Sequence, residues 1–125
     1  MTDARRRTGQ IAEDLVAARL AAADWEIVER NARTRYGELD IVARDGNVLV
    51  FVEVKGARAG TEHGPERPIC SIDFRKQRRV RRLATAWISE RRDQPLYDDI
   101  RFDAVGVILD RGGRPLQVEH LQGAF

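Results

Sequence analysis

The chain has 125 residues, of which 42% are hydrophobic and 34% charged, which is enough for one domain with a modest core. Its longest purely apolar run is the five residues 48–52, and no apolar segment follows the N-terminal arginines. We therefore expect neither a membrane span nor a secretory signal. The single Cys70 excludes an internal disulfide and a cysteine zinc site and is typical of the reducing cytoplasm, and two histidines are too few for a histidine-rich metal site.

The N-terminal third is expected to contain a basic arm, a helix and a strand. Residues 1–7 are polar and basic, as in a flexible arm. Thr8 is a suitable N-cap for a helix ending near Ala23, with apolar residues along one face. A strand is predicted over residues 25–30, followed by a basic turn over residues 31–36. Two arginines of this turn could contact a nucleic-acid backbone or could simply be solvated; they are Arg33 and Arg35.

Residues 37–55 have the pattern of a β-hairpin. Asp45 and Gly46 form a strong short-loop signal, because type I′ turns need positive φ at both central residues. If these are the two loop residues, the numbers of paired residues sum to 91 and Glu38 faces Glu53. One face of the hairpin is then wholly apolar and should be buried; it consists of Leu39, Ile41, Val48, Val50, Val52 and Val54.

The opposite face of this hairpin carries Asp40, Glu53 and Lys55, since side chains alternate along each strand. Paired carboxylates suit Mg²⁺ or Mn²⁺, which keep several waters and bind substrate phosphates. A lysine on the same side could orient a water or neutralise charge developing on a phosphate. The alternative is a Glu–Lys surface pair at a strand end, which contributes little.

The segment after Lys55 is predicted to be a long loop over residues 56–68, with three glycines and two prolines. Ser71 then caps a second helix that continues to about Arg91. One helix face is apolar, with Ile72, Val80, Leu83, Ala84 and Trp87. Lys76 falls inside this apolar arc, so its stem is expected to pack inward.

The opposite face of the second helix is strongly basic. Residues 71–92 contain eight basic and two acidic residues, a net charge of +6, whereas the rest of the chain sums to −4. Such a stripe is typical of a surface for nucleic-acid phosphates, but it also fits a solvated helix face or another acidic partner. Its members are Arg75, Arg78, Arg79, Arg81 and Arg82.

The C-terminal part is predicted to add two strands. Residues 100–109 become a nearly continuous apolar run, as in a buried strand, and residues 116–120 form a short last strand. Asp103 is expected to be mainly structural, His120 a packing residue rather than a base, and Phe125 part of the core. The order αβββαββ suits an α/β fold with a mixed sheet flanked by helices.

The split acids, Asp40 followed by Glu53-Val54-Lys55, resemble the signature of the PD-(D/E)XK nuclease superfamily. More closely, the chain resembles the YraN family of small bacterial nuclease-like proteins, over almost its whole length. The matching residues are Thr8-Gly9 through Glu13, Asn31, 37–41, 51–55, Lys76, Arg101-Phe102-Asp103, and the terminal segment from Glu119-His120 to Ala124-Phe125. One position departs from the family: an arginine commonly follows the lysine by two positions, where this chain has Ala57 and then Arg58.

The resemblance implies a single nuclease-like domain with a restriction-endonuclease-like core. It implies a cytoplasmic metal-dependent endonuclease that hydrolyses phosphodiester bonds in DNA, including structured or branched DNA, with Mg²⁺ or Mn²⁺ as cofactor. Many relatives of this fold act as homodimers. A second class of function stays open at this point: a non-catalytic module that binds nucleic acid or a protein partner and retains the fold.

The resemblance also assigns roles. Asp40 and Glu53 would bind the metal together with the Val54 carbonyl, and Lys55 would position the attacking water. Glu13 would add a metal ligand, or it is simply a first-turn acid favoured by the helix dipole. Glu38 and Lys76 would support the site. The expected nucleic-acid contacts are Arg33, Arg35, Arg58, Arg75, Arg78, Arg79 and Arg82.

Overall fold

The computed structural model describes residues 3–60 and 67–125, which form a five-stranded mixed sheet with two α-helices and a short 3-10 helix. The elements are α1 (Asp3–Ala22), β1 (Glu26–Thr34), β2 (Gly37–Asp45), β3 (Val48–Arg58), η1 (Pro68–Ser71), α2 (Phe74–Glu90), β4 (Asp99–Leu109) and β5 (Pro115–Leu121). The predicted order of elements is confirmed. Within the described ranges, no helix is long and apolar enough to cross a membrane.

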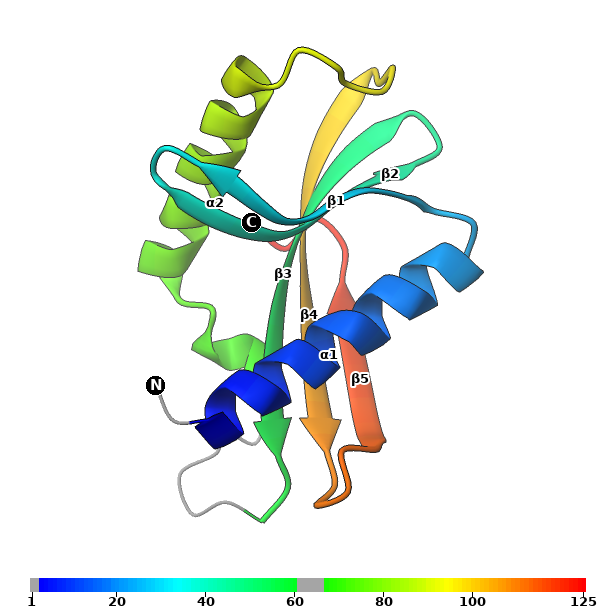
Figure 1. Cartoon of the computed structure of the whole chain (residues 1–125), viewed down its shortest axis with the longest axis vertical. Coiled ribbons are helices and arrows are strands. Elements are labelled where there is room, and N and C mark those ends of the chain that lie inside the picture. Colours follow the sequence, from blue (N-terminus) through cyan, green and yellow to red (C-terminus); the bar gives the residue numbers. More distant parts are fainter. Residues whose placement is uncertain (1–2, 61–66) are drawn as a thin grey trace.

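The strands lie in the order β1-β2-β3-β4-β5, and only β3 and β4 pair in parallel. The two helices cover opposite faces of this sheet (Figure 1). Leu20 and Val16 of α1 pack on Val50 and Val107 on one face. On the other face, α2 packs on β2 and β3, where the ring of Trp87 meets that of Phe51 edge to face at 5.8 Å. The core therefore forms two layers, one on each side of the sheet.

The register of the central hairpin differs from the prediction by two residues. Asp45 pairs with Val48, so the paired numbers sum to 93 and the loop consists of Gly46 and Asn47. Gly46 has φ +62° and Asn47 is not among the residues with positive φ, which fits a type II′ turn with glycine at its first central position. Because a shift of two residues preserves the alternation of side chains, the faces predicted for β3 remain correct.

The predicted apolar face of β2 is wrong at Leu39. Ile41 and Ala43 pack against α1, but Leu39 packs on the α2 side with Ala32. The change of side coincides with a distortion in the neighbouring strand, where Asn31 has φ +49°. Asparagine tolerates this left-handed conformation better than most residues. The side chains of β2 thus change face between Leu39 and Ile41, opposite the distorted backbone of Asn31.

β1 and its turn also differ from the prediction. The strand continues to Thr34, which pairs with Gly37, so the turn predicted over residues 31–36 contains only Arg35 and Tyr36. Thr34 explains the tightness of this turn: its Oγ1 donates to the Gly37 carbonyl at 2.9 Å and accepts from the Tyr36 N–H at 3.1 Å. Local side-chain bonds of this kind favour turns.

α1 begins at Asp3, so residues 3–7 are helical rather than a flexible arm, and residues 1–2 lie outside the described residues. Thr8 is not an N-cap. It is 7% exposed within the helix, and its Oγ1 donates to the Ala4 carbonyl at 2.9 Å. The same oxygen accepts from Nε of Arg58 at 2.8 Å. Thr8 thus ties α1 to the end of β3.

The loop predicted over residues 56–68 begins later than expected. β3 continues to Arg58 in unbroken parallel register with β4, with Gly56 beside Val107. Residues 61–66 lie outside the described residues, and Pro68 opens η1. Arg58, which is predicted to contact phosphate, makes hydrogen bonds within the protein instead. Besides its bond to Thr8, it donates to the Arg111 carbonyl at 2.9 Å.

The predicted cap of the second helix is also wrong. Ser71 ends η1, where its Oγ donates to the Pro68 carbonyl at 2.8 Å, whereas Asp73 is the N-cap and accepts from the Lys76 N–H at 3.0 Å. Ile72 is buried but lies outside the helix. The rest of the apolar face is confirmed as buried: Val80, Leu83, Ala84 and Trp87. Lys76, however, is exposed rather than packed inward.

Gly56 allows α1 to lie unusually close to β3. A Cβ at this position would stand 2.8 Å from Cβ of Ala12 and 3.2 Å from the Thr8 carbonyl. Gly56→Ala is therefore expected to destabilise the fold by about 1–3 kcal/mol through overpacking. Gly9→Ala is the matched control, since no atom lies within 4 Å of its Cβ, and it should be neutral or stabilise α1. Urea unfolding of both variants tests this, and equal stability would contradict the close approach.

Candidate functional site

The candidate site lies where β2 separates from β3. Their ladder ends at the pair Ile41–Val52, and the next residues along the two strands are Asp40 and Glu53. The Val54 N–H donates to Oδ2 of Asp40 at 2.8 Å, so the carboxylate replaces the next backbone partner of β3. Figure 1 shows the β1–β2 hairpin turning away from β3 toward α2 at this point. Because the strands separate here, side chains from the helices on both faces of the sheet can approach the two acids.

Asp40 and Glu53 are each half-buried, and their side chains are hydrogen-bonded to each other. Burial, together with the charge of Asp40 and this hydrogen bond, raises the pKa of Glu53 to about 8 from an ordinary value of 4.5. Burial also raises the pKa of Asp40, although the Val54 N–H and the Glu53 hydrogen bond act in the opposite direction. Both acids therefore hold protons more readily than usual, and a cation bound between them would favour their ionised forms.

α1 contributes a third acid to the same place. Burial and the charge of Asp40 raise the pKa of Glu13 to about 7, against a smaller opposing effect of Arg30. Oε1 of Glu13 is buried, and among the described residues it has no hydrogen-bond partner. Most buried polar atoms in native proteins are satisfied, so this oxygen near Asp40 is available to bind a water molecule or a cation. Arg30, which sequence reasoning missed, is held by Asp14 at 2.6 Å.

α2 contributes positive charge from the other face. Lys76 lowers the pKa of Glu53 and Arg79 lowers the pKa of both Asp40 and Glu53, although burial outweighs them. Arg79 thus faces the acids rather than lying only in the basic stripe, and a Cβ on Gly37 would be 3.1 Å from its guanidinium. Lys55 is half-buried on β3, on the same side as Glu53, and forms no ion pair within the described part of the chain.

A hollow of about 350 Å³ lies between the β1–β2 hairpin and α2; Asp40 and Glu53 are not among its lining residues, but Arg79, whose charge acts on both, is. Its lining combines basic, acidic and small residues: Arg33, Thr34, Gly37, Glu38 and Arg79. Glu38 is exposed, and its charge contributes to the raised pKa values of Glu13 and Asp40. Two of the predicted nucleic-acid contacts, Arg33 and Arg79, therefore converge on one hollow at the site.

The remaining predicted contacts do not reach the acids. Arg75, Arg78 and Arg82 lie exposed along α2 and form no ion pair among the residues that the structure describes. Arg35 is held near Glu90 at 3.8 Å in the β1–β2 turn. The basic face of α2 consequently stays largely unneutralised and continues from the acidic site along the helix.

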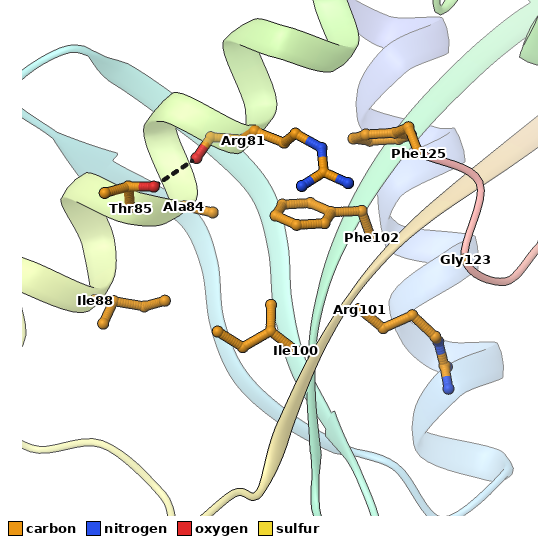
Figure 2. A pocket seen from close by; sticks show the side chains of 9 residues that line it. All are labelled: Arg81, Ala84, Thr85, Ile88, Ile100, Arg101, Phe102, Gly123 and Phe125. Carbon is orange, nitrogen blue, oxygen red and sulfur yellow. Dashed lines mark hydrogen bonds between the residues drawn. The ribbon is translucent and has the colours of Figure 1, made fainter.

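A larger hollow, of about 460 Å³, lies elsewhere, between α2, the first residues of β4 and the C-terminal segment (Figure 2). Figure 2 shows the guanidinium of Arg81 over the Phe102 ring, 4.6 Å from its centre, with Phe125 beside it. None of the residues that line it is an acid. The larger volume of this hollow therefore does not make it the functional site. We place the candidate site at Asp40 and Glu53, next to the smaller hollow.

Asp103 is structural, as predicted. It is fully buried and accepts hydrogen bonds from Arg101 Nε at 2.8 Å, His120 Nε2 at 2.8 Å and the Gly123 N–H at 3.0 Å. Burial would raise the pKa of Asp103, but these hydrogen bonds outweigh burial and hold it below its usual range. His120, predicted to be a packing residue, also lies edge to face against the ring of Trp25, with ring centres 5.7 Å apart. Phe125 packs on Phe102 with ring centres 5.5 Å apart, which confirms its predicted place.

The donor set suits a hard divalent cation that keeps part of its water shell. A bound cation would favour the ionised forms of three carboxyl groups with raised pKa values and would give the Oε1 atom of Glu13 a partner. Within residues 3–60 and 67–125, no group of three or more histidine, cysteine, aspartate or glutamate side chains is placed to hold a metal ion, so the pair Asp40 and Glu53 is the core of the donor set. Mg²⁺ is usually held by one or two carboxylates plus waters and substrate phosphate, so an open site of this kind fits it.

The raised pKa of Glu53 predicts a pH dependence of stability. An acid with a raised pKa stabilises the fold fully below about 4.5 and loses this contribution as the pH rises through about 8. In chelator, Glu53→Gln should therefore gain about 2 kcal/mol over wild type between pH 5 and pH 8. Urea unfolding at both pH values measures this difference, and a difference independent of pH would contradict the burial of Glu53.

The fold and the site define the class of the protein: an α/β protein of restriction-endonuclease-like architecture, with paired acids where two strands diverge. The profile of Uncharacterised protein family UPF0102 matches residues 12–107. The chain belongs to this family, also called the YraN family, which confirms the resemblance seen in the sequence.

Relatives extend the match over nearly the whole chain. A UPF0102 protein of Streptomyces griseus is 45% identical over 122 residues, covering 97% of this chain and 98% of its own. One from Rhodococcus opacus is 44% identical over 117 residues, covering 94% of both chains. One from Moorella thermoacetica is 44% identical over 125 residues, covering both chains completely.

Proposed function

We propose that this protein is a cytoplasmic Mg²⁺- or Mn²⁺-dependent endonuclease that hydrolyses phosphodiester bonds in DNA. The observation that carries the proposal is the pairing of Asp40 and Glu53 at the strand divergence, with Glu13 of α1 close enough to Asp40 for its pKa to be raised by that charge. Buried acids that repel each other lower the stability of a fold, so their arrangement favours a functional role.

Asp40 and Glu53 would hold the metal, with Glu13 and the Val54 carbonyl as further oxygen ligands. When bound, the ion would polarise the phosphoryl group and offset the charge that develops on the leaving oxygen. Lys55 would orient the water whose oxygen attacks phosphorus in line with the P–O bond that breaks. The products would be a phosphate monoester and an alcohol.

The positive residues on the α2 side would hold the substrate. Arg79 and Lys76 would contact the phosphate nearest the acids, and Glu38 would support the site by adding to its negative charge. The exposed face of α2 would hold the backbone further along, through Arg75, Arg78 and Arg82. One site cuts one strand, so cleavage of both strands of a duplex would use a homodimer.

A cleavage assay tests the proposal. The full chain is incubated with labelled single-stranded, blunt duplex, flap and four-way-junction DNA, and with matched RNA, in Mg²⁺, Mn²⁺ or chelator. We expect cleavage of at least one DNA form with either metal and none in chelator. Binding without cleavage of any substrate would contradict the proposal and would favour a non-catalytic nucleic-acid-binding module on the same fold.

A further inference from the structure

The turn between β1 and β2 carries an exposed aromatic side chain whose position folding does not explain. Tyr36 is 46% exposed and belongs to neither face of the sheet's core. The shape of the turn is maintained by Thr34, whose hydroxyl bonds the backbone on both sides of the turn. The hydrogen bonds that shape the turn therefore do not involve the tyrosine ring.

The turn is nevertheless held in place against α2. The Arg35 N–H donates to Oε2 of Glu90 at 3.3 Å, near the end of that helix. Figure 1 shows the tip of the β1–β2 hairpin beside α2. An exposed ring on an anchored turn is a preorganised contact surface, which loses little freedom when a ligand binds.

Two guanidinium groups lie over the Tyr36 ring. That of Arg82 is 4.3 Å from the ring centre and that of Arg35 is 4.9 Å from it. Solvent-exposed cation–π contacts are weaker than the stacking of a nucleobase on an aromatic ring. A base can therefore displace a guanidinium from the ring, and the released cation then becomes available for the adjacent phosphate.

Tyr36 also stands next to the hollow at the acidic site. Gly37 and Glu38, the next two residues, line that hollow together with Arg33 and Arg79. From Tyr36 to Asp40 the strand rises by about 13 Å at the usual spacing per residue. At about 3.4 Å per nucleotide of a stacked strand, this corresponds to about four nucleotides.

We propose that Tyr36, with Arg35 and Arg82, is a stacking platform for an unpaired nucleobase, so that the substrate carries a single-stranded stretch beside the bond that is cut. The inference rests on the proposed function and narrows its substrate class. In a blunt duplex each base is paired and stacked within the helix and offers no free face to the ring, whereas a single strand, flap or overhang does.

Binding in chelator tests the platform without cleavage. Fluorescence anisotropy of the full chain is measured with a labelled single strand, a duplex with a single-stranded overhang, and a blunt duplex. Tyr36→Leu removes the aromatic face at similar size, and Tyr36→Phe retains it. We expect Tyr36→Leu to bind the single strand and the overhang about tenfold more weakly or worse, with Tyr36→Phe close to wild type and binding of the blunt duplex unchanged in both.

Three results would overturn the inference: wild-type affinity of Tyr36→Leu for the single strand, an equal loss for all three ligands, or an equal loss in Tyr36→Phe. Photocrosslinking of a bromouracil-containing strand gives an independent readout, with the adduct expected at Tyr36 and absent in Tyr36→Leu. Failure of this inference is distinct from failure of the proposed function. A wild-type chain that cuts DNA while Tyr36→Leu binds normally refutes only the platform. If the wild-type chain binds no nucleic acid, both the stacking platform and the proposed function are refuted. The turn would then be a contact surface for a protein partner.

Discussion

Asp40→Asn and Glu53→Gln are each expected to lower metal-dependent cleavage by about 10³-fold or more, because each removes a carboxylate that would hold the metal ion against the reacting phosphate. The Val54 N–H fixes the Asp40 carboxylate at 2.8 Å, which positions it for this role. Cleavage of the best DNA substrate in Mg²⁺, followed as a single-turnover rate, is the measurement.

The same two variants should fold at least as well as the wild type. At neutral pH without metal, each substitution removes a carboxyl group whose charge is opposed by burial, so the free energy of unfolding should stay equal or increase. Asp93→Asn is the matched control, since Asp93 is exposed beyond the end of α2. Retained cleavage in either site variant, or an equal loss in Asp93→Asn, would contradict the assignment of the site.

Asp103→Ala is expected to lower the free energy of unfolding by about 3–5 kcal/mol, the largest effect on stability that we foresee. The change leaves Arg101, His120 and the Gly123 N–H without the carboxylate that now accepts from all three. It also loosens the C-terminal segment, whose Ala124 N–H bonds the Phe102 carbonyl at 2.8 Å. Urea unfolding at neutral pH measures the loss.

Glu119→Gln provides the control for Asp103→Ala. Glu119 forms an ion pair with Arg67 at the surface, and such pairs contribute less than about 1 kcal/mol. A loss of stability in Asp103→Ala no larger than that of Glu119→Gln would show that the buried network is not a major support of the fold.

The positions of the candidate site residues could be predicted mainly from the alternation of side chains along the hairpin strands. Asp40 and Glu53 meet as predicted although the predicted hairpin register is wrong, because an error of two residues preserves the alternation along β3. Alternation fails in β2 at Leu39, which packs on the α2 side. The turn itself was misassigned by one residue at each end, since Asp45-Gly46 and Gly46-Asn47 are both plausible loop pairs in sequence.

The errors lie where tertiary contacts override local signals. Thr8 has the chemistry of an N-cap, but here it bonds within α1 and to Arg58, a residue far along the chain. Gly56 looks like the start of a loop, whereas it is a strand residue without a side chain because α1 passes directly over it. A single sequence contains no pattern from which such a close approach of two distant segments can be read.

Helical periodicity also could not predict that Arg79 faces Asp40 and Glu53. Periodicity places it on a uniform basic face, but the β1–β2 hairpin bends toward α2 and brings Gly37 and Glu38 beside its guanidinium. That bend depends on Asn31 and on the early end of the β2–β3 ladder. Neither feature is encoded by alternation alone.

The most direct test of the account is Mn²⁺ binding by calorimetry, with wild type compared against Asp40→Asn under identical conditions. The account predicts binding by the wild type with release of protons, since Glu53 and Glu13 have pKa values of about 8 and about 7 and must ionise to accept the cation. Binding should be lost or weakened at least tenfold in Asp40→Asn. Equal binding by both proteins, or no binding by the wild type with or without DNA, would contradict a metal site at the divergence of β2 and β3.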